Sequence, residues 1–144
     1  LFARQNQHLI IKRNYGKIPK VECYASQLNQ VFFSLIDNAI DAVKQKKEDG
    51  NITVTTCVTD DSELNHDTEN KKVIQIQISD NGYGIPEDIQ SKVFDPFFTS
   101  KDVGEGRGLG LSLAYGIMQQ HHGRVYFKSD PGHGSDFFVE IPLS

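Results

Sequence analysis

The residues with the strongest chemical signal are glycines that directly precede an expected helix. Four of the 12 glycines fall within seven positions, at Gly104, Gly106, Gly108 and Gly110. Glycine lets the backbone approach a ligand closely, and the N–H groups and positive dipole end of a helix N-terminus attract phosphate. The cluster therefore predicts a phosphate cradle, with a flexible loop as the alternative. It contains no G-x-x-x-x-G-K-[ST] sequence and no strand–glycine loop–helix unit with a ribose-binding acid, which excludes a P-loop and a dinucleotide fold.

A polar stripe on a long amphipathic helix is the second signal. Its members follow the spacing i, i+4, i+7, i+8 and i+11 and are Gln30, Ser34, Asp37, Asn38 and Asp41. Because apolar residues cover much of the helix circumference, we expect the stripe to lie near the boundary of the core. An asparagine amide oxygen can complete an octahedral Mg²⁺ shell made mainly of phosphate oxygens and water. The alternative is a solvated helix face.

Two loop segments carry further polar and aromatic signals. Asp80 ends an expected strand and is followed by Asn-Gly-Tyr-Gly-Ile, so its carboxylate could accept a hydrogen bond from an exocyclic amine. An Asn-Gly turn is the alternative for this segment. The stretch Phe94–Lys101 holds three phenylalanines beside the glycine cluster. It is typical either of a lid hinge or of a hydrophobic cluster under a long loop.

The elements expected to position these residues alternate between strands and helices. Period-two patterns and apolar runs predict strands at 8–13, 20–24, 51–58, 73–79, 124–128 and 136–141. Helices are predicted from an N-cap at Ser26 to Lys47, over 86–92, and over 108–122 with Gly123 at the C-terminal cap. Residues 59–71 are expected to form a surface loop or a flexible hairpin connection. This order favours an α+β fold in which helices pack on one face of a mixed or mainly antiparallel sheet.

Composition limits the class of protein. The chain has 144 residues, a mass of 16.2 kDa, 38% hydrophobic residues and a mean hydropathy of −0.43, as expected for one globular domain. No apolar run approaches the length of a membrane span, and the first residues lack a signal-peptide core. The net charge of −4 argues against nucleic-acid binding. Because Cys23 and Cys57 cannot form a zinc site or a disulfide framework, a cytosolic protein is the simplest interpretation.

In their order and spacing, five segments resemble the ATP-binding catalytic domain of sensor histidine kinases (the HATPase_c or Bergerat domain). This domain belongs to a superfamily that includes the type II topoisomerase ATPase subunits, the Hsp90 chaperone and the MutL mismatch-repair proteins. The segments resemble the N, G1, F, G2 and final glycine boxes, and they are SLIDNAIDAV around Asn38, DNGYGI at 80–85, Phe94–Lys101, GEGRGLGLS at 104–112 and DPGHGS at 130–135.

The resemblance implies a two-layer α+β sandwich of three helices on a mixed five-stranded sheet, with a flexible lid over Mg-ATP. Asn38 would bind the metal and the phosphates, and Asp80 would bind the N6 amine of adenine. Gly82 and Gly84 would let the backbone pass close to the base, and Ser135 would support the water network beside Asp80. The remaining residues that the resemblance assigns to ATP binding are Ser34, Asp41, Ile85, Phe94, Thr99, Lys101, Gly106, Arg107, Gly108, Leu109, Gly110 and Leu111.

Three positions depart from the family pattern. Ser34 stands where ATP-hydrolysing relatives carry a water-activating glutamate, which favours phosphotransfer over fast hydrolysis. Asp41 stands where many members have lysine, so Lys44, Lys101 or Arg107 is expected to supply the charge that neutralises the phosphates. Arg107 also replaces a common threonine, and its guanidinium either reaches the γ-phosphate or faces water.

The resemblance also implies partners. None of the five histidines lies in a phosphoacceptor-like helical pattern, so the acceptor histidine is expected on a separate dimerisation hairpin. Residues 1–7 would then be a linker remnant and 8–144 the ATP-binding domain, monomeric when isolated. A response regulator receiver domain would be the downstream partner, and a membrane anchor on the full-length protein stays open. The alternatives are an ATP-hydrolysing or Ser/Thr-kinase member of the superfamily, or a non-catalytic nucleotide-sensing module.

Overall fold

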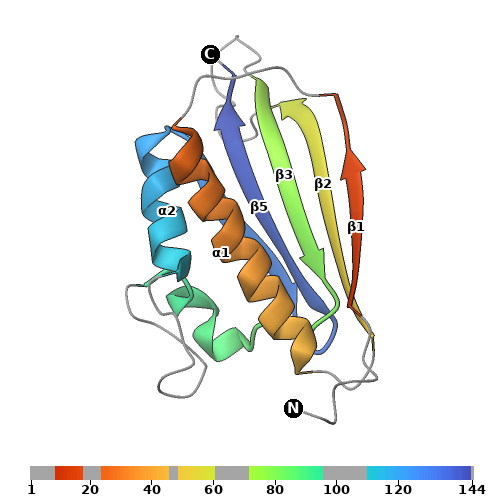
Figure 1. The fold of residues 1–144 in the computed structure, drawn as a ribbon. Coiled ribbons are helices and arrows are strands. Elements are labelled where there is room, and N and C mark those ends of the chain that lie inside the picture. Colours follow the sequence, from red (N-terminus) through yellow and green to blue (C-terminus); the bar gives the residue numbers. More distant parts are fainter. Residues whose placement is uncertain (1–8, 18–23, 46–48, 61–71, 96–109, 144) are drawn as a thin grey trace.

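A five-stranded sheet with helices on one face forms the domain (Figure 1). The structure, a computed structural model, describes residues 9–17, 24–45, 49–60, 72–95 and 110–143. The strands are β1 (Leu9–Tyr15), β2 (Gly50–Asp60), β3 (Lys72–Asp80), β4 (Arg124–Asp130) and β5 (Gly134–Pro142). The helices are α1 (Ala25–Lys44), the 3-10 helix η2 (Glu87–Lys92) and α2 (Gly110–Gln120).

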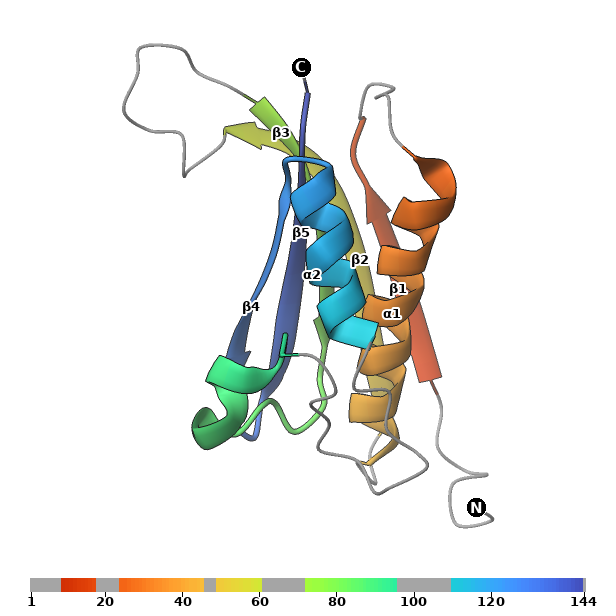
Figure 2. The ribbon, with the colours of Figure 1, turned by 90° about the vertical axis from the view of Figure 1, so that its left-hand side faces the viewer.

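The sheet is mixed and mainly antiparallel, as predicted. Its strand order is β1-β2-β3-β5-β4; β1 and β2 are parallel, and the other neighbours are antiparallel. Figures 1 and 2 show α1 and α2 side by side on the same face of this sheet. The α+β two-layer architecture is therefore confirmed. The connection predicted at 59–71 begins too early, because Thr59 and Asp60 are the last residues of β2 and pair with β3; residues 61–71 lie outside the described part of the chain.

The core forms where the apolar stripe of α1 meets alternate residues of the central strands. Residues of α1 at helical spacing are almost fully buried: Leu28, Val31, Leu35, Ala39 and Val43. They pack with residues of β3 and β5 that share one sheet face, namely Ile74, Ile76, Ile78, Phe137, Val139 and Ile141, and with Ala114 and Met118 of α2. Burying each large side chain contributes roughly 1.5–3 kcal/mol, so this interface fixes α1 against the sheet.

The start of α1 differs from the sequence prediction. Its N-cap is Tyr24, and no side-chain cap bond is formed, so Ser26 lies inside the helix. The N–H groups of Gln27 and Leu28 donate to the Tyr24 carbonyl at 2.9 and 3.0 Å. The N–H of Tyr24 itself donates to Nε2 of His121 at 3.3 Å. A contact with the end of α2 therefore fixes this helix start, which no local capping pattern reveals. The predicted strand at 20–24 lies outside the described residues except for this N-cap.

The C-terminal cap of α2 also differs from the expectation. The left-handed residue is His122, with φ of 57°, and not Gly123. The Gly123 N–H donates to the carbonyl of Met118 at 2.9 Å, which closes the cap. A Cβ on Gly123 would lie 2.2 Å from the carbonyl oxygen of Glu140. Glycine is thus needed at this position because the chain passes close to β5, and not because of its φ.

The sheet face opposite the helices carries a buried acid. Glu140 is 3% exposed, and its two oxygens accept hydrogen bonds from Arg124 Nε at 2.8 Å, Gln75 Nε2 at 2.9 Å and Tyr126 OH at 2.9 Å. Burial acts to raise the pKa of Glu140, but these hydrogen bonds and the Arg124 charge hold it below its ordinary value. Burial and the Glu140 contact raise the pKa of Tyr126 to about 12. The network ties β3, β5 and β4 together at the end of the sheet remote from Asp80.

We expect Glu140→Gln to lower the free energy of unfolding by about 2 to 3 kcal/mol, because three hydrogen bonds lose their charged acceptor. The folded-state pKa lies below the ordinary value of 4.5, so the carboxylate's contribution is complete well above pH 4.5. It is lost as the pH falls through the folded-state pKa. Urea unfolding should therefore show a gap between the two proteins at pH 7 that narrows in acid. Glu87→Gln, on the exposed surface of η2, is the control; equal stability of wild type and Glu140→Gln at pH 7 would contradict the assignment.

Candidate functional site

The predicted site residues converge at one end of the domain. Figure 1 shows that β3 ends, α1 ends and α2 begins at the same end of the sheet, next to η2. The turn between β4 and β5 lies there too, because Asp80 pairs with Ser135 in the register of β3 and β5. Segments that are more than 90 residues apart in the sequence are thereby brought together around the carboxylate of Asp80.

Asp80 is a buried acid at the end of β3. It is 7% exposed, and its Oδ1 accepts a hydrogen bond from the N–H of Gly82 at 2.9 Å. Its second oxygen, Oδ2, is also buried. Alternation along β3 points Asp80 to the helix-covered face, in line with Ile76 and Ile78. Because this carboxylate is buried, a ligand amine can donate a hydrogen bond to it only from within a cavity.

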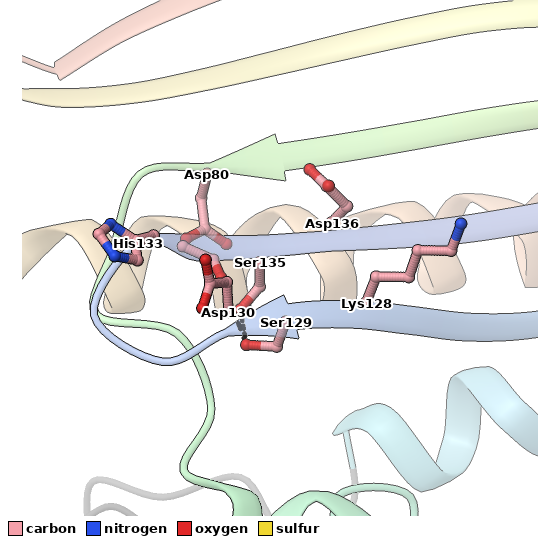
Figure 3. Close-up of a pocket in the computed structure, with 8 residues that line it drawn as sticks. Asp80, Lys128, Ser129, Asp130, His133, Ser135 and Asp136 are labelled. Carbon is pink, nitrogen blue, oxygen red and sulfur yellow. Dashed lines mark hydrogen bonds between the residues drawn. The ribbon is translucent and has the colours of Figure 1, made fainter.

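A cavity of about 250 Å³ reaches Asp80 from the β4–β5 turn. It is lined by Asp80, Lys128–Asp130 and His133–Asp136. Figure 3 shows Asp80, Ser129, Asp130 and Ser135 gathered at the hairpin end of the strands, with Ser129 and Ser135 joined by a hydrogen bond. Apart from Gly134, every lining residue has a polar side chain, and polar groups are what fix the orientation of a ligand in a site.

Asn38 lies on the side of α1 that faces the loop after Asp80. A Cβ on Gly82 would lie 2.9 Å from atoms of Ala42, so this loop packs directly on α1. Asn38 precedes Ala42 by four residues and shares its side of the helix. Four residues of the predicted polar stripe border the core, because they are half-buried: Ser34, Asp37, Asn38 and Asp41. The prediction is wrong for Gln30, which is exposed. Glycine at position 82 is therefore needed for close packing against α1.

The glycine-containing loop is fixed to the β4–β5 turn by backbone contacts. Gly84 has φ of +77°, and a Cβ there would lie 2.6 Å from the carbonyl oxygen of Asp130. The N–H of Ile85 donates to Ser129 Oγ at 2.7 Å, and the N–H of Gly132 donates to the Tyr83 carbonyl at 2.5 Å. These contacts hold the loop against the β4–β5 turn and bond Ile85 to Ser129, which lines the cavity.

Two residues of this site, Asn81 and Ser129, make contacts that the sequence does not predict. Asn81 Oδ1 accepts from the N–H of Asn51 at 2.8 Å, and its Nδ2 donates to the carbonyl of Asp49 at 3.1 Å, which joins the loop to the start of β2. Ser129 joins the loop to β4 through Ile85. Both are short polar residues beside a predicted turn, and that is the only local signal that marks them. Their partners lie 30 and 44 residues away.

Phe94 belongs to an aromatic cluster. Its ring centroid lies 5.6 Å from that of Tyr115, 5.9 Å from that of Phe127 and 6.4 Å from that of Phe137. It also packs against the main core. The sequence predicts either a lid hinge or a hydrophobic cluster for the segment that begins at Phe94, and the described part of this segment forms a hydrophobic cluster. This cluster anchors the chain after η2 to α2, β4 and β5.

Most of the predicted phosphate-binding segment lies outside the described residues. This applies to Thr99, Lys101, Gly106, Arg107, Gly108 and Leu109. Gly110 is the first residue of α2, and Leu111 is half-buried against the core. The N-terminus of an 11-residue helix thus lies at the end of the domain where β3 and α1 end. Its N–H groups and dipole are suited to an anion.

Comparison with known proteins identifies the class of this domain. A family model described as "Histidine kinase-, DNA gyrase B-, and HSP90-like ATPase" (HATPase_c) matches residues 23–144. The chain belongs to this family of ATP-binding domains. Within the family it corresponds to the catalytic domain of sensor histidine kinases, as its similarity to such proteins shows.

Several sensor kinases and their structures are similar to the chain. The sensor kinase CckA of Brucella abortus is 39% identical over 137 residues, which are 92% of this chain and 14% of CckA. The adaptive-response sensory kinase SasA of Crocosphaera subtropica is 38% identical over 88% of this chain and 30% of its own length. The nucleotide-free catalytic domain of histidine kinase ThkA has a TM-score of 0.70 at 29% identity, over 94% of this chain and 79% of that domain. The chain therefore spans a minor part of the curated sensor kinases. Among the described residues no helix is long and apolar enough to cross a membrane.

Proposed function

We propose that this domain binds Mg-ATP between α1 and the β3–α2 end of the sheet and presents the γ-phosphoryl group for transfer to a histidine. The observation that carries this proposal is the burial of Asp80 at the end of β3, where Asp80 and Ser135 both line a cavity. An ionised carboxylate only accepts hydrogen bonds, so it fits the exocyclic amine of adenine. A 6-oxo purine would set its carbonyl against the same oxygens.

The phosphate end of the site is assigned to α1 and α2. Asn38 offers an amide oxygen on the side of α1 that packs on the loop after Asp80, and α2 offers the N–H groups of its first turn. In the described residues, no group of three or more His, Cys, Asp or Glu side chains is placed to hold a metal ion. A single amide oxygen suits Mg²⁺ that arrives with the phosphates, because Mg²⁺ keeps several ligands from substrate and water. The bound metal would neutralise charge on the transferring phosphoryl group.

Phosphotransfer is favoured over hydrolysis by the residue one turn before Asn38. Ser34 is half-buried on the same stripe of α1, and a serine hydroxyl is a poor proton acceptor at neutral pH. The domain then acts by positioning the nucleotide and neutralising its charge. The acceptor histidine and its base would come from a dimerisation hairpin outside residues 8–144, and a receiver domain would take the phosphoryl group next. Thr99, Lys101 and Arg107 remain predicted phosphate contacts.

We expect acid-labile phosphate on a separately expressed cognate hairpin when the chain is added with Mg²⁺ and γ-labelled ATP. Asn38→Ala should lower the initial rate at least about 100-fold, since it removes an interaction with the transferring group. Asn29→Ala, on the exposed side of the same helix, is the matched control and should keep the rate. Sustained phosphate release without the hairpin would favour the ATPase alternative. ATP binding without transfer to any hairpin would favour a nucleotide-sensing module.

A further inference from the structure

Ser129 lies at the junction of three parts of the site. Its Oγ accepts the N–H of Ile85 at 2.7 Å, donates to the carbonyl of Gly134 at 3.3 Å and lies 3.1 Å from Ser135 Oγ. Ser135 is buried and pairs with Asp80 across β3 and β5. Ser129 is half-buried on β4, directly opposite Ser135 in the register of β4 and β5. Figure 3 shows the two serines side by side at the hairpin end.

The hydrogen-bonding capacity of Ser129 determines the direction of the bond between the two serines. A hydroxyl has one proton and two lone pairs. Ser129 has two acceptors for its one proton, the carbonyl of Gly134 at 3.3 Å and Ser135 Oγ at 3.1 Å, and one of its lone pairs accepts from Ile85. We assign the proton to the carbonyl of Gly134, because a carbonyl cannot donate whereas Ser135 can, so that only this assignment makes all three contacts hydrogen bonds. The remaining lone pair can only accept, so Ser135 is the donor in the contact of 3.1 Å. Ser135 therefore has its own proton engaged and presents only lone pairs to the cavity.

We propose that Ser129 is a positioning residue for nucleotide selection, which orients the Ser135 hydroxyl so that the base meets only acceptors at Asp80 and Ser135. This proposal rests on the proposed nucleotide site. Two acceptors side by side favour a 6-amino purine, either directly or through a water molecule that donates to both residues. A 6-oxo purine needs a hydrogen-bond donor at this position. Ser135 could donate its hydroxyl proton, but Ser129 accepts that proton and so keeps it from the base.

The proposal predicts a change in selectivity rather than a simple loss of binding. In Ser129→Ala the Ser135 proton is released and can turn to a 6-oxo group. We expect the ratio of the Kd for ITP to the Kd for ATP to fall about five-fold, which corresponds to one neutral hydrogen bond. ITP is the probe because its base carries the 6-oxo group without the 2-amino group of guanine. A reduced fraction of folded protein changes both constants alike and leaves their ratio unchanged.

The experiment is equilibrium titration of the chain with ATP and ITP in the presence of Mg²⁺. Ser129→Thr keeps the hydroxyl on a residue that suits a strand and should retain the wild-type ratio. Ser91→Ala, on the exposed surface of η2, is the control for loss of a hydroxyl elsewhere. In a Ser135→Ala background, Ser129→Ala should change the ratio no further, because its effect acts through Ser135.

The outcomes separate this inference from the proposed function. If the wild-type chain binds neither nucleotide, the proposed function fails, and the inference fails with it. If the wild-type chain prefers ATP and Ser129→Ala keeps the same ratio, only the role of Ser129 is overturned. The role is also overturned if Ser129→Thr behaves like Ser129→Ala, or if Ser129→Ala still shifts the ratio in the absence of the Ser135 hydroxyl.

Discussion

Asp80→Asn is expected to weaken ATP binding by about 100-fold or more, because it reverses the hydrogen-bonding character of one buried atom. Asparagine has the shape of aspartate, and its Oδ1 can still accept from the N–H of Gly82 at 2.9 Å. The change therefore leaves the loop in place and replaces only the buried Oδ2 with an NH2 group. A donor then faces the donor amine of adenine, and buried groups that cannot pair reject a ligand strongly.

Titration calorimetry with Mg-ATP measures this loss, and urea unfolding of the same samples verifies that the variant is folded. Asp88→Asn is the matched control, since Asp88 is exposed on η2, near the same end of the domain. Binding by Asp80→Asn within about threefold of the wild type would remove Asp80 from the base-binding role. If Asp80→Asn binds ITP better than ATP, the direction of the hydrogen bond is supported independently.

The strands and long helices could be predicted from the sequence because their signals are local. Ile74, Ile76 and Ile78 alternate with polar residues, and that alternation is sufficient to place Asp80 on the buried face of β3. The spacing of Val31 and Leu35 in α1 likewise places Asn38 at the margin of the core. The positions of Asp80 and Asn38 in the fold can therefore be predicted from periodicity alone.

Contacts between distant segments could not be predicted in this way. Ser129 has a role in the site because its hydroxyl bonds to Ile85 and Ser135. The bond to Ile85 depends on the strand order, which places β5 between β3 and β4. The start of α1 depends on His121 at the far end of α2. Neither residue belongs to a local pattern that distinguishes it from an ordinary surface residue.

The glycines show the same distinction. Their clustering indicated a ligand, but the structure gives Gly82 and Gly84 packing roles against α1 and against the β4–β5 turn. Both roles require the bare backbone for close approach, and only Gly84 also requires positive φ. Contact of Gly82 and Gly84 with the adenine base stays a prediction. The nucleotide titrations of the Asp80 and Ser129 variants bear on it, because both residues are bonded to the loop that contains these glycines.

Gly134→Ala is expected to destabilise the domain by about 3 to 5 kcal/mol, because backbone strain and a steric clash act together at this position. Gly134 has φ of +123°, a conformation that costs an alanine strain energy. A Cβ at this position would also lie 2.2 Å from the carbonyl oxygen of Asp80, so β3 and β5 would have to move apart. The displacement falls at the base of the cavity, and ATP binding should weaken in the molecules that remain folded.

Two other glycines separate the two causes of this effect. Gly132 has φ of +89° but nothing within 4 Å of its Cβ position, so Gly132→Ala carries only the strain and should cost about 1 kcal/mol. Gly116 in α2 has neither positive φ nor a close neighbour, so Gly116→Ala should stabilise the domain by up to about 1 kcal/mol. Chemical unfolding of the three variants should give this order. If Gly134→Ala were as stable as Gly132→Ala, then the close approach of the β4–β5 turn to Asp80, on which the cavity depends, would be refuted.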